Sequence, residues 1–279
     1  MSRLAAVRRV RSNLMERFGG LLLGVEATLV YLFLYVPVTV LVVLSFNDSR
    51  YAIVWEGFTT KWYQQLLAGN SVSRVNPEVA FTALQNSLLI AAVTVLVSVV
   101  FGTMLALALD RYEFPGKSLL TGVVYMPLVI PSIVMGISLL LFFNSVGVSA
   151  GLVTATIGHI AFDISYVTVI VLARLQTFDD THKEAAMDLG ASELETFRYV
   201  TLPLIKPGII AGALLGFAMS FDDFVVTFFI IGNKNTLPIF FFSMVRQGIS
   251  PGVNVVATLI LAATLLVIVL AQRFQGPTW

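Results

Sequence analysis

The heptapeptide EAAMDLG at residues 184–190, followed by VTLP at residues 200–203, is the stretch from which the rest of the chain is interpreted. It is polar and helix-forming, whereas most of the chain is strongly apolar. Thr181 and Glu184 have the Thr-x-x-Glu spacing of a capping box, which predicts a helix that starts at His182.

The residues that follow predict a bend and a second helix. Gly190 is placed to end the first helix, because glycine readily adopts the left-handed conformation found after helix C-termini. Ser192 and Glu195 repeat the capping-box spacing, so a second short helix is expected at once. Pro203 is expected to break the chain before the next apolar run.

This pattern resembles the EAA loop in the permease subunits of ABC importers. In that family Glu-Ala-Ala is followed after three residues by Gly, and nine residues later by Ile-x-Leu-Pro; the spacing matches, with Val200 in place of Ile. Ala185 and Ala186 carry so little side chain that another protein can approach the backbone closely. The resemblance implies a coupling loop at about 178–203 that docks on a partner ATPase through Glu184, Ala185, Ala186, Asp188, Gly190, Leu202 and Pro203.

The composition is that of an integral membrane protein. Hydrophobic residues make up 57% of the chain and charged residues only 12%, about half the charged share of a soluble domain. The absence of cysteine excludes disulfides and thiolate metal sites, and the two histidines, His159 and His182, lie far apart in the sequence. The chain has no P-loop motif. We therefore expect no metal or cofactor in this chain and no ATP hydrolysis through a P-loop. The resemblance to ABC permeases implies a transport subunit rather than an enzyme, with ATP hydrolysis in a partner.

The apolar runs predict an all-α, polytopic membrane protein with six transmembrane helices. About 20 apolar residues of helix cross a bilayer core. After a cytoplasmic N-terminal segment (1–20), a single permease domain (21–279) is expected, because the first run is too long for a signal peptide. Between the last two spans, residues 232–252 predict a short helix or re-entrant segment. The expected spans are about 21–46, 84–109, 118–144, 153–176, 204–231 and 253–273.

The distribution of Lys and Arg predicts the orientation of these spans. Twelve of the 17 basic residues fall on one side if both termini, the 110–117 turn and the 174–206 segment share it. The positive-inside rule places that side in the cytoplasm of a multi-pass inner-membrane protein. The other five, which fall outside, are Arg50, Lys61, Arg74, Lys234 and Arg246.

The third span contains Pro127 and Pro131, with Gly136 close behind. Membranes tolerate broken backbone hydrogen bonds only where the helix is buried in protein or lines a cavity. A proline kink for packing and a role in the pore remain equal alternatives.

Acids inside apolar spans are candidates for function, because each costs about 2.5–3.5 kcal/mol on insertion scales. Glu26 is close enough to the cytoplasmic end of its span to reach the interface. Asp222 and Asp223 are adjacent and point about 100° apart on a helix, so both cannot face one pore centre. One can cap the next helical turn, which leaves the other free for a cation. Asp163 lies in the fourth span.

Segments outside the loop resemble spermidine/putrescine permeases of the PotC type over nearly the whole chain. The resemblance implies Asp222 as the acid for a cation and a substrate pathway formed by Asp222, Asp223, Asp163, Phe221 and Tyr166, since aromatic faces suit cations and methylenes. Where the family commonly has Asp after Pro131, this chain has Ser132, and Asp163 is a guessed replacement. The segments that carry the resemblance are 45–50, 55–63, 220–223 and 243–251.

These observations favour the permease subunit of an ATP-driven ABC importer that moves polyamines such as spermidine and putrescine. Its expected partners are a related second permease, an ATPase dimer, an extracytoplasmic substrate-binding protein and membrane lipid, with no nucleic acid. The alternatives are an ABC permease for another small cationic or organic solute, a passive channel, or an intramembrane aspartyl enzyme using Asp163 and Asp222. The enzyme and the channel leave the Glu-Ala-Ala loop without a purpose, and the Gly-x-Gly-Asp signature of intramembrane aspartyl proteases is absent.

Overall fold

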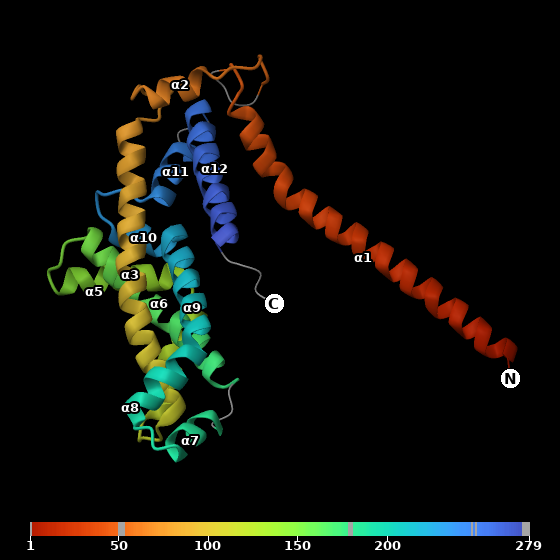
Figure 1. Ribbon diagram of the computed structural model, residues 1–279. Helices are drawn as coiled ribbons and strands as arrows, with labels where there is room; N and C mark the ends of the chain where they lie inside the picture. The colour runs from red at the N-terminus through yellow and green to blue at the C-terminus, as the bar shows by residue number, and fades with distance from the viewer. Residues whose placement is uncertain (1, 50–53, 178–180, 247, 249, 275–279) are drawn as a thin grey trace. The chain divides into compact units, whose positions relative to one another are not determined.

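The computed structural model describes the chain except for residues 1, 50–53, 178–180, 247, 249 and 275–279 (Figure 1). Within the described part, all regular secondary structure is helical. The helices are α1 (Ser2–Leu44), α2 (Lys61–Leu67), α3 (Pro77–Arg111), α4 (Lys117–Val129), α5 (Ser132–Ser145), α6 (Leu152–Leu175), α7 (Thr181–Asp188), α8 (Glu193–Thr196), the π-helical turn η1 (Phe197–Thr201), α9 (Leu202–Asp222), α10 (Val225–Ile230), α11 (Leu237–Arg246) and α12 (Pro251–Phe274).

The helices divide into two compact units, one formed by residues 1–77 with 244–279 and the other by residues 78–243. In the first unit, α1 and α2 both contact α12. Trp62 of α2 is buried there against Val72 and Val255, and its indole Nε1–H donates to the Asn47 carbonyl oxygen at 2.7 Å. A buried indole with a satisfied N–H anchors the segment between α1 and α3 to α12.

Four described helical stretches are long and apolar enough to cross a membrane, and the pair α4–α5 makes a fifth if it counts as one broken span. These confirm an all-helical membrane protein. In α12 the apolar stretch that the structure describes, Pro251–Leu266, is shorter than the other spans. The count of six spans therefore stays a prediction. The four stretches are Gly19–Leu44, Pro77–Arg111, Leu152–Leu175 and Glu193–Asp222.

The third predicted span is not one straight helix, because α4 and α5 meet at 110°. Ile130 is extended (φ −68°, ψ 130°) directly before Pro131, as expected because the proline ring disfavours the α conformation of the residue before it. The ring of Phe229 and the backbone of Val226, on α10, pack against Gly136 of α5, where they occupy the space that a Cβ would need. Pro131 therefore lies at a sharp turn of the chain, which is more than a kink, whereas Pro127 lies within the continuous helix α4.

The fifth span differs from the prediction at both ends. Pro203 does not break the chain, because one helical stretch runs from Glu193 to Asp222. The turn η1 widens directly before Pro203, and the N–H of Leu202 donates to the Phe197 carbonyl five residues earlier. Proline then falls in the first turn of α9, where a missing N–H costs little. At the other end the helix stops at Asp222 rather than 231, and α10 forms separately.

A ladder of glycines packs α9 against α6 in the second unit. A Cβ at Gly208 would lie 2.7 Å from Arg174 Cβ, and one at Gly212 would lie 3.4 Å from Val167 Cα. At Gly216 the neighbour is Asp163. This four-residue spacing of small residues lets two helix backbones approach closely, as is common in membrane bundles. Helices α6 and α9 therefore form the most extensive helix–helix contact of the unit.

The segment predicted to form a short helix between the last two spans contains α11. Its start is tied to α3 by two hydrogen bonds: the Leu237 N–H donates to Ser87 Oγ at 2.8 Å, and Asn86 Nδ2 donates to the Asn235 carbonyl at 2.8 Å. The helix is confirmed, and its place in a membrane leaflet stays a prediction.

Candidate functional site

The 178–203 segment has the predicted order of helix, glycine bend and helix. Helix α7 begins at Thr181, one residue earlier than the capping box predicted, and residues 178–180 lie outside the described residues. Gly190 has φ +91°, the left-handed conformation expected after the helix, and its N–H donates to the Met187 carbonyl at 2.9 Å. An L-residue at this φ would be strained.

The second capping box is formed as predicted. Ser192 Oγ accepts from the Glu195 N–H at 3.4 Å, and the Glu195 carboxylate accepts from the Ser192 N–H at 2.8 Å. These reciprocal bonds satisfy two N–H groups at the start of α8. Through η1, the box joins the loop directly to α9.

Large apolar side chains of this segment face outward. The exposed fractions are 51% for Met187, 91% for Leu189 and 74% for Leu194, and no residue of α7 is buried. Ala186 is half-buried, while Glu184, Ala185 and Asp188 are exposed. A short polar helix with exposed leucines beside it is a surface suited to contact with another protein.

The loop is attached to the C-terminal end of α3. Arg111 Nη2 donates to Thr201 Oγ1 at 2.9 Å, and Thr201 is buried. Figure 1 shows α7 and α8 at the same end of this unit as the end of α3. A hollow of about 360 Å³ opens there, and its lining residues are Asp110, Arg111, Tyr112, Lys183, Met187, Glu193 and Thr196.

The two adjacent acids at the end of α9 have different environments. Asp223 follows the helix and accepts from Thr227 N–H and Thr227 Oγ1–H, each at 2.8 Å, at its Oδ2. It caps α10, as the sequence predicted for one of the pair. Asp222 is exposed. Adjacent residues therefore supply one structural carboxylate and one that solvent can reach.

A buried histidine links α6 to this cap. His159 Nδ1 lies 2.7 Å from Ser220 Oγ, and His159 Nε2 lies 2.8 Å from Thr227 Oγ1 and 3.4 Å from Asp223 Oδ2. A consistent order of donors runs from Ser220 O–H to Nδ1, from Nε2–H to Thr227, and from Thr227 O–H to Asp223. In this order His159 is neutral, and one chain of bonds ties α6, α9 and α10 together.

Sequence reasoning missed this network. It considered His159 only in setting aside a histidine metal site, and it gave Ser220 no role of its own. A signal was present in the spacing, because Ser220 continues the series Gly208, Gly212, Gly216 at every fourth residue. Such a series marks the face on which a polar side chain meets a neighbouring helix.

Asp163 is fully buried between helices. Its exposed fraction is 0%, and neither carboxyl oxygen has a hydrogen-bond partner among the described residues. Its Oδ2 lies 3.4 Å from the position a Cβ would take at Gly216. The carboxyl is thus enclosed by helix packing, and its role in a substrate pathway stays a prediction.

The predicted aromatic residues fall into two ring contacts. Tyr166 packs edge-on against Phe162, with ring centroids 6.4 Å apart, and Phe162 lies 5.3 Å from the His159 ring. Phe221 stacks on Phe217 of the same helix at 5.8 Å. Only Phe221 is a sequence neighbour of the exposed Asp222. The role of these rings in substrate contact stays a prediction.

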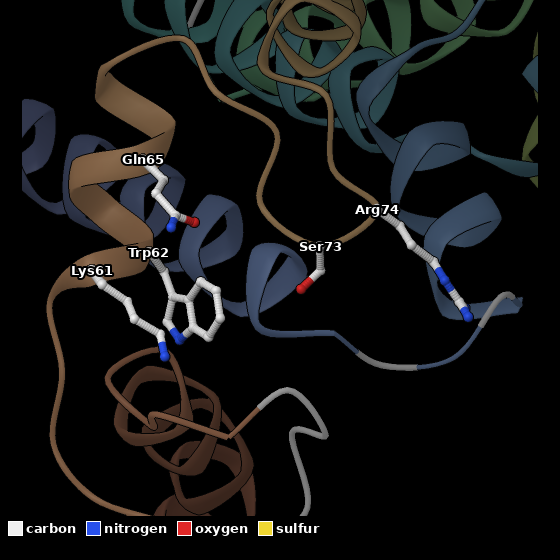
Figure 2. Close-up of a pocket in the computed structure, with 5 residues that line it drawn as sticks. All are labelled: Lys61, Trp62, Gln65, Ser73 and Arg74. Carbon is white, nitrogen blue, oxygen red and sulfur yellow. The ribbon is translucent and has the colours of Figure 1, made fainter.

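A basic hollow of about 540 Å³ lies in the first unit (Figure 2). Lys61, Trp62 and Gln65 of α2 line it, together with Ser73 and Arg74 from the following loop. Lys61 lies 4.3 Å from the centre of the Trp62 ring and forms an ion pair with Asp48. The distribution of Lys and Arg predicts that this segment lies on the outer side of the membrane.

Several apolar spans, a polar helical loop and buried ionisable groups together define a membrane transport subunit. The sequence matches over residues 98–277 the family described as "Binding-protein-dependent transport system inner membrane component". The chain belongs to this family.

Two relatives from Escherichia coli (strain K12) are each 40% identical to the chain. One is the "Spermidine/putrescine transport system permease protein PotC", aligned over 91% of this chain and 94% of the relative. The other is the "Putrescine transport system permease protein PotI", aligned over 84% and 83%. Identity at this level over most of both chains supports the family assignment.

A solved structure shares the fold. It is a bacterial ABC transporter involved in the import of the acidic polysaccharide alginate, with a TM-score of 0.67, 16% identity and coverage of 94% of this chain and 98% of that chain. At this identity the likeness concerns the fold alone. It agrees with the all-helical membrane architecture.

Proposed function

We propose that this chain is the transmembrane permease subunit of an ATP-driven importer for polyamines, with spermidine and putrescine as its substrates. The observation that carries the importer role is α7 with its glycine bend, a short helix that displays unburied leucines beside the start of a long membrane helix. Exposed apolar groups outside the membrane favour contact with a partner protein.

The partner at the α7 surface is the ATPase subunit of the importer. The 178–203 loop faces the cytoplasm and docks on the ATPase through Glu184, Ala186 and Gly190. Both termini lie on the same side, and the six spans of the sequence analysis form one permease domain. The family description supports a separate substrate-binding protein outside. A second permease chain completes the pathway. The loop is continuous with α9 through η1, so movement at the ATPase passes directly to the α6–α9 pair.

The substrate assignment rests on the named relatives and on one carboxylate. PotC and PotI are named for spermidine and putrescine transport. Asp222 is exposed while its neighbour Asp223 is engaged as a helix cap. An accessible carboxylate within a membrane protein, beside the Phe221 ring, suits an ammonium group joined to methylenes. The aspartyl-enzyme alternative is set aside, because the family is one of transport components.

The test is uptake of labelled spermidine and putrescine into vesicles that carry the whole complex. We expect Asp222→Asn to assemble and to hydrolyse ATP, yet to import polyamine at about one tenth of the wild-type rate or less. A charge-assisted hydrogen bond contributes about 1.5–3 kcal/mol, and about 1.4 kcal/mol corresponds to a factor of ten. Glu26→Gln is the matched control, because it removes an exposed acid from another apolar span.

The outcomes separate the parts of the proposal. If the wild-type complex imports a neutral sugar or an anion but no polyamine, the substrate is wrong and the importer role stands. Normal polyamine import by Asp222→Asn would instead make this acid part of the scaffold.

A further inference from the structure

Asp163 is the one buried acid for which the packing of the second unit supplies no hydrogen bond. Its carboxyl has an exposed fraction of 0%, and both oxygens are unpaired among the described residues. By contrast, the nearby His159 and Asp223 are fully engaged with hydroxyl and N–H groups. An unpaired polar group is therefore held inside the helix packing, in contact with the backbone position of Gly216.

Two further unpaired groups lie on the helix that faces it. Thr94 and Ser98 are one helical turn apart on α3, both are 0% exposed, and both hydroxyls lack a partner among the described residues. Buried hydroxyls without partners are uncommon in proteins, and α3 carries three of those found among the described residues: Thr94, Ser98 and, further along the helix, Thr103.

Contacts of two glycines bring these groups to the same level. A Cβ at Gly216 would lie 3.4 Å from Asp163 Oδ2 and 3.7 Å from Val95 Cγ2. A Cβ at Gly102 would lie 2.8 Å from Val167 Cβ. Residue 95 of α3 therefore lies near residue 163 of α6, and residue 102 of α3 lies near residue 167 of α6. Because both residue numbers increase together, the two helices run in the same direction. Thr94 and Ser98 flank Val95 and lie at the level of Asp163.

Among the described residues of the second unit, no cation lies near enough to balance an ionised Asp163. Helix α3 carries no charged residue between Glu78 and Asp110, and Lys206 is the one basic residue of α9. Lys206 is ten residues from Gly216, or about 15 Å along the helix, and Arg174 is about 16 Å from Asp163 along α6. The other titratable groups on these elements are His159, Tyr166, Asp222 and Asp223. Helix α4, which also packs on α6, adds Tyr125 and Lys117, and Lys117 is the first residue of α4 and forms an ion pair with Glu113.

An isolated carboxylate in such surroundings takes up a proton instead of remaining ionised, because burial of an unpaired charge is far more costly than neutralisation. We propose that the seam between α3, α6 and α9 is a proton-binding site, in which Asp163 is the neutral acid while the helices are packed as described. When α9 moves away from α6, water reaches the carboxyl, the O–H bond breaks, and the proton passes to water. The carboxylate that remains then adds one negative charge beside the pathway.

The proton-binding site is inferred from the helix packing alone. Only its part in transport rests on the proposed function. A charge that is present in the opened bundle and absent in the closed one attracts a cationic substrate during opening. When the helices close again, Asp163 takes up a proton and no longer attracts the cationic substrate. In this way Asp163 contributes to the binding and the release of a cation without being a permanent ligand.

Infrared difference spectroscopy tests the protonation state directly. The purified complex of full-length chains is compared with the same complex carrying Asp163→Asn, at neutral pH and without nucleotide. We expect a carboxylic-acid C=O band in the wild type that is missing in the variant and shifts in D₂O. Carboxylate bands in place of the acid band would overturn the proposal, whatever solute the complex transports.

The pH dependence of thermal stability provides a second readout, with Glu26→Gln as the control for loss of an exposed acid. Ionisation of Asp163 is disfavoured only in the packed state, so the wild-type complex should lose stability relative to Asp163→Asn as the pH rises. We expect the gap in Tm to widen toward alkaline pH and to close toward acid pH. A gap that is constant over the whole range would contradict the proposal.

If Asp163→Asn does not assemble, Asp163→Ala serves in both measurements, because the smaller side chain leaves Gly216 and Val95 undisturbed. A wild-type spectrum recorded alone over the same pH range can still overturn the proposal. The acid band must persist at neutral pH, and its absence would overturn the proposal.

Discussion

At the scale of single residues, His159 is the side chain that connects three helices by hydrogen bonds. It bonds to Ser220 on α9 and to Thr227 on α10, and its Nε2 also lies close to the Asp223 carboxylate. A neutral imidazole with one donor and one acceptor fits between a hydroxyl that donates and one that accepts. The role of the histidine is therefore to fix the relative positions of three helices.

Removal of this imidazole should destabilise the bundle. We expect His159→Ala to lower the free energy of unfolding by about 1–3 kcal/mol for each buried hydroxyl left unpaired, which thermal unfolding of the purified complex measures as a lower Tm. His182→Ala is the matched control, because this second histidine is exposed on α7 and should leave Tm unchanged. Equal stability of the two variants would mean that the buried network contributes nothing.

The sequence predicted one carboxylate of the Asp222–Asp223 pair as a cap, and the structure assigns this part to Asp223. Capping is local chemistry between residues four apart, so it can be predicted from the chain. The contact between His159 and Ser220 joins residues 61 positions apart. Composition and local spacing do not specify a contact between residues so far apart in the sequence, so the pairing of His159 with Ser220 was not predicted.

At the scale of the element, α7 is held by a bend that only glycine adopts without strain. The prediction is that Gly190→Val abolishes transport and the stimulation of ATP hydrolysis by loaded binding protein, while the protein still inserts. A β-branched residue at φ +91° costs about 1–3 kcal/mol and turns the helix away from its direction. Uptake and ATPase assays on the reconstituted complex measure both effects.

Gly116 supplies a matched control for this experiment. It also has φ +91°, in the turn between α3 and α4, with open space where a Cβ would project. Gly116→Val therefore introduces the same backbone strain away from α7, and we expect transport to persist. Ala186→Trp tests the same surface by bulk instead of strain. Normal transport by both Gly190→Val and Ala186→Trp would remove the docking role from this loop.

Helix ends were predicted well where a local capping or glycine signal sets them. They were predicted less well at prolines, because a proline can either break a helix or be accommodated in one. Gly190 and the Ser192 box gave the bend and the second helix in the places expected. Pro131, in contrast, produced a 110° turn, whereas Pro203 was absorbed by the wider turn η1. The sequence of a proline and its neighbours does not specify which of these follows, because the packing of the surrounding helices decides it.

At the scale of the whole molecule, the orientation of the chain is the prediction most open to test. A cysteine at Asn70 should react with an impermeant thiol reagent added outside intact cells, and one at Ser192 should react only after the membrane is opened. Both side chains are exposed, and the chain has no native cysteine to interfere. Labelling in the opposite pattern would mean that the bundle is inserted the other way.

The membrane class and the approximate positions of the spans could be predicted because an uncharged apolar run of about 20 residues matches the thickness of a bilayer core. The helix ends could not. The fifth apolar run continues past Asp222, yet the backbone stops there, because the Asp223 carboxylate caps a new helix. Hydropathy is averaged over many residues, so it does not locate a helix end that one capping side chain determines.

The polar face of α6 has a consequence for how the protein is made. Ribosomes complete α6 before α9 exists, and Ser220 and Thr227 are synthesised 61 and 68 residues after His159. During that interval the imidazole lacks its hydroxyl partners and α9 does not yet cover Asp163, and a central Asp alone is disfavoured by about 2.5–3.5 kcal/mol. Helix α6 must therefore remain at the insertion machinery until α9 emerges, so that the two helices enter the bilayer as a pair.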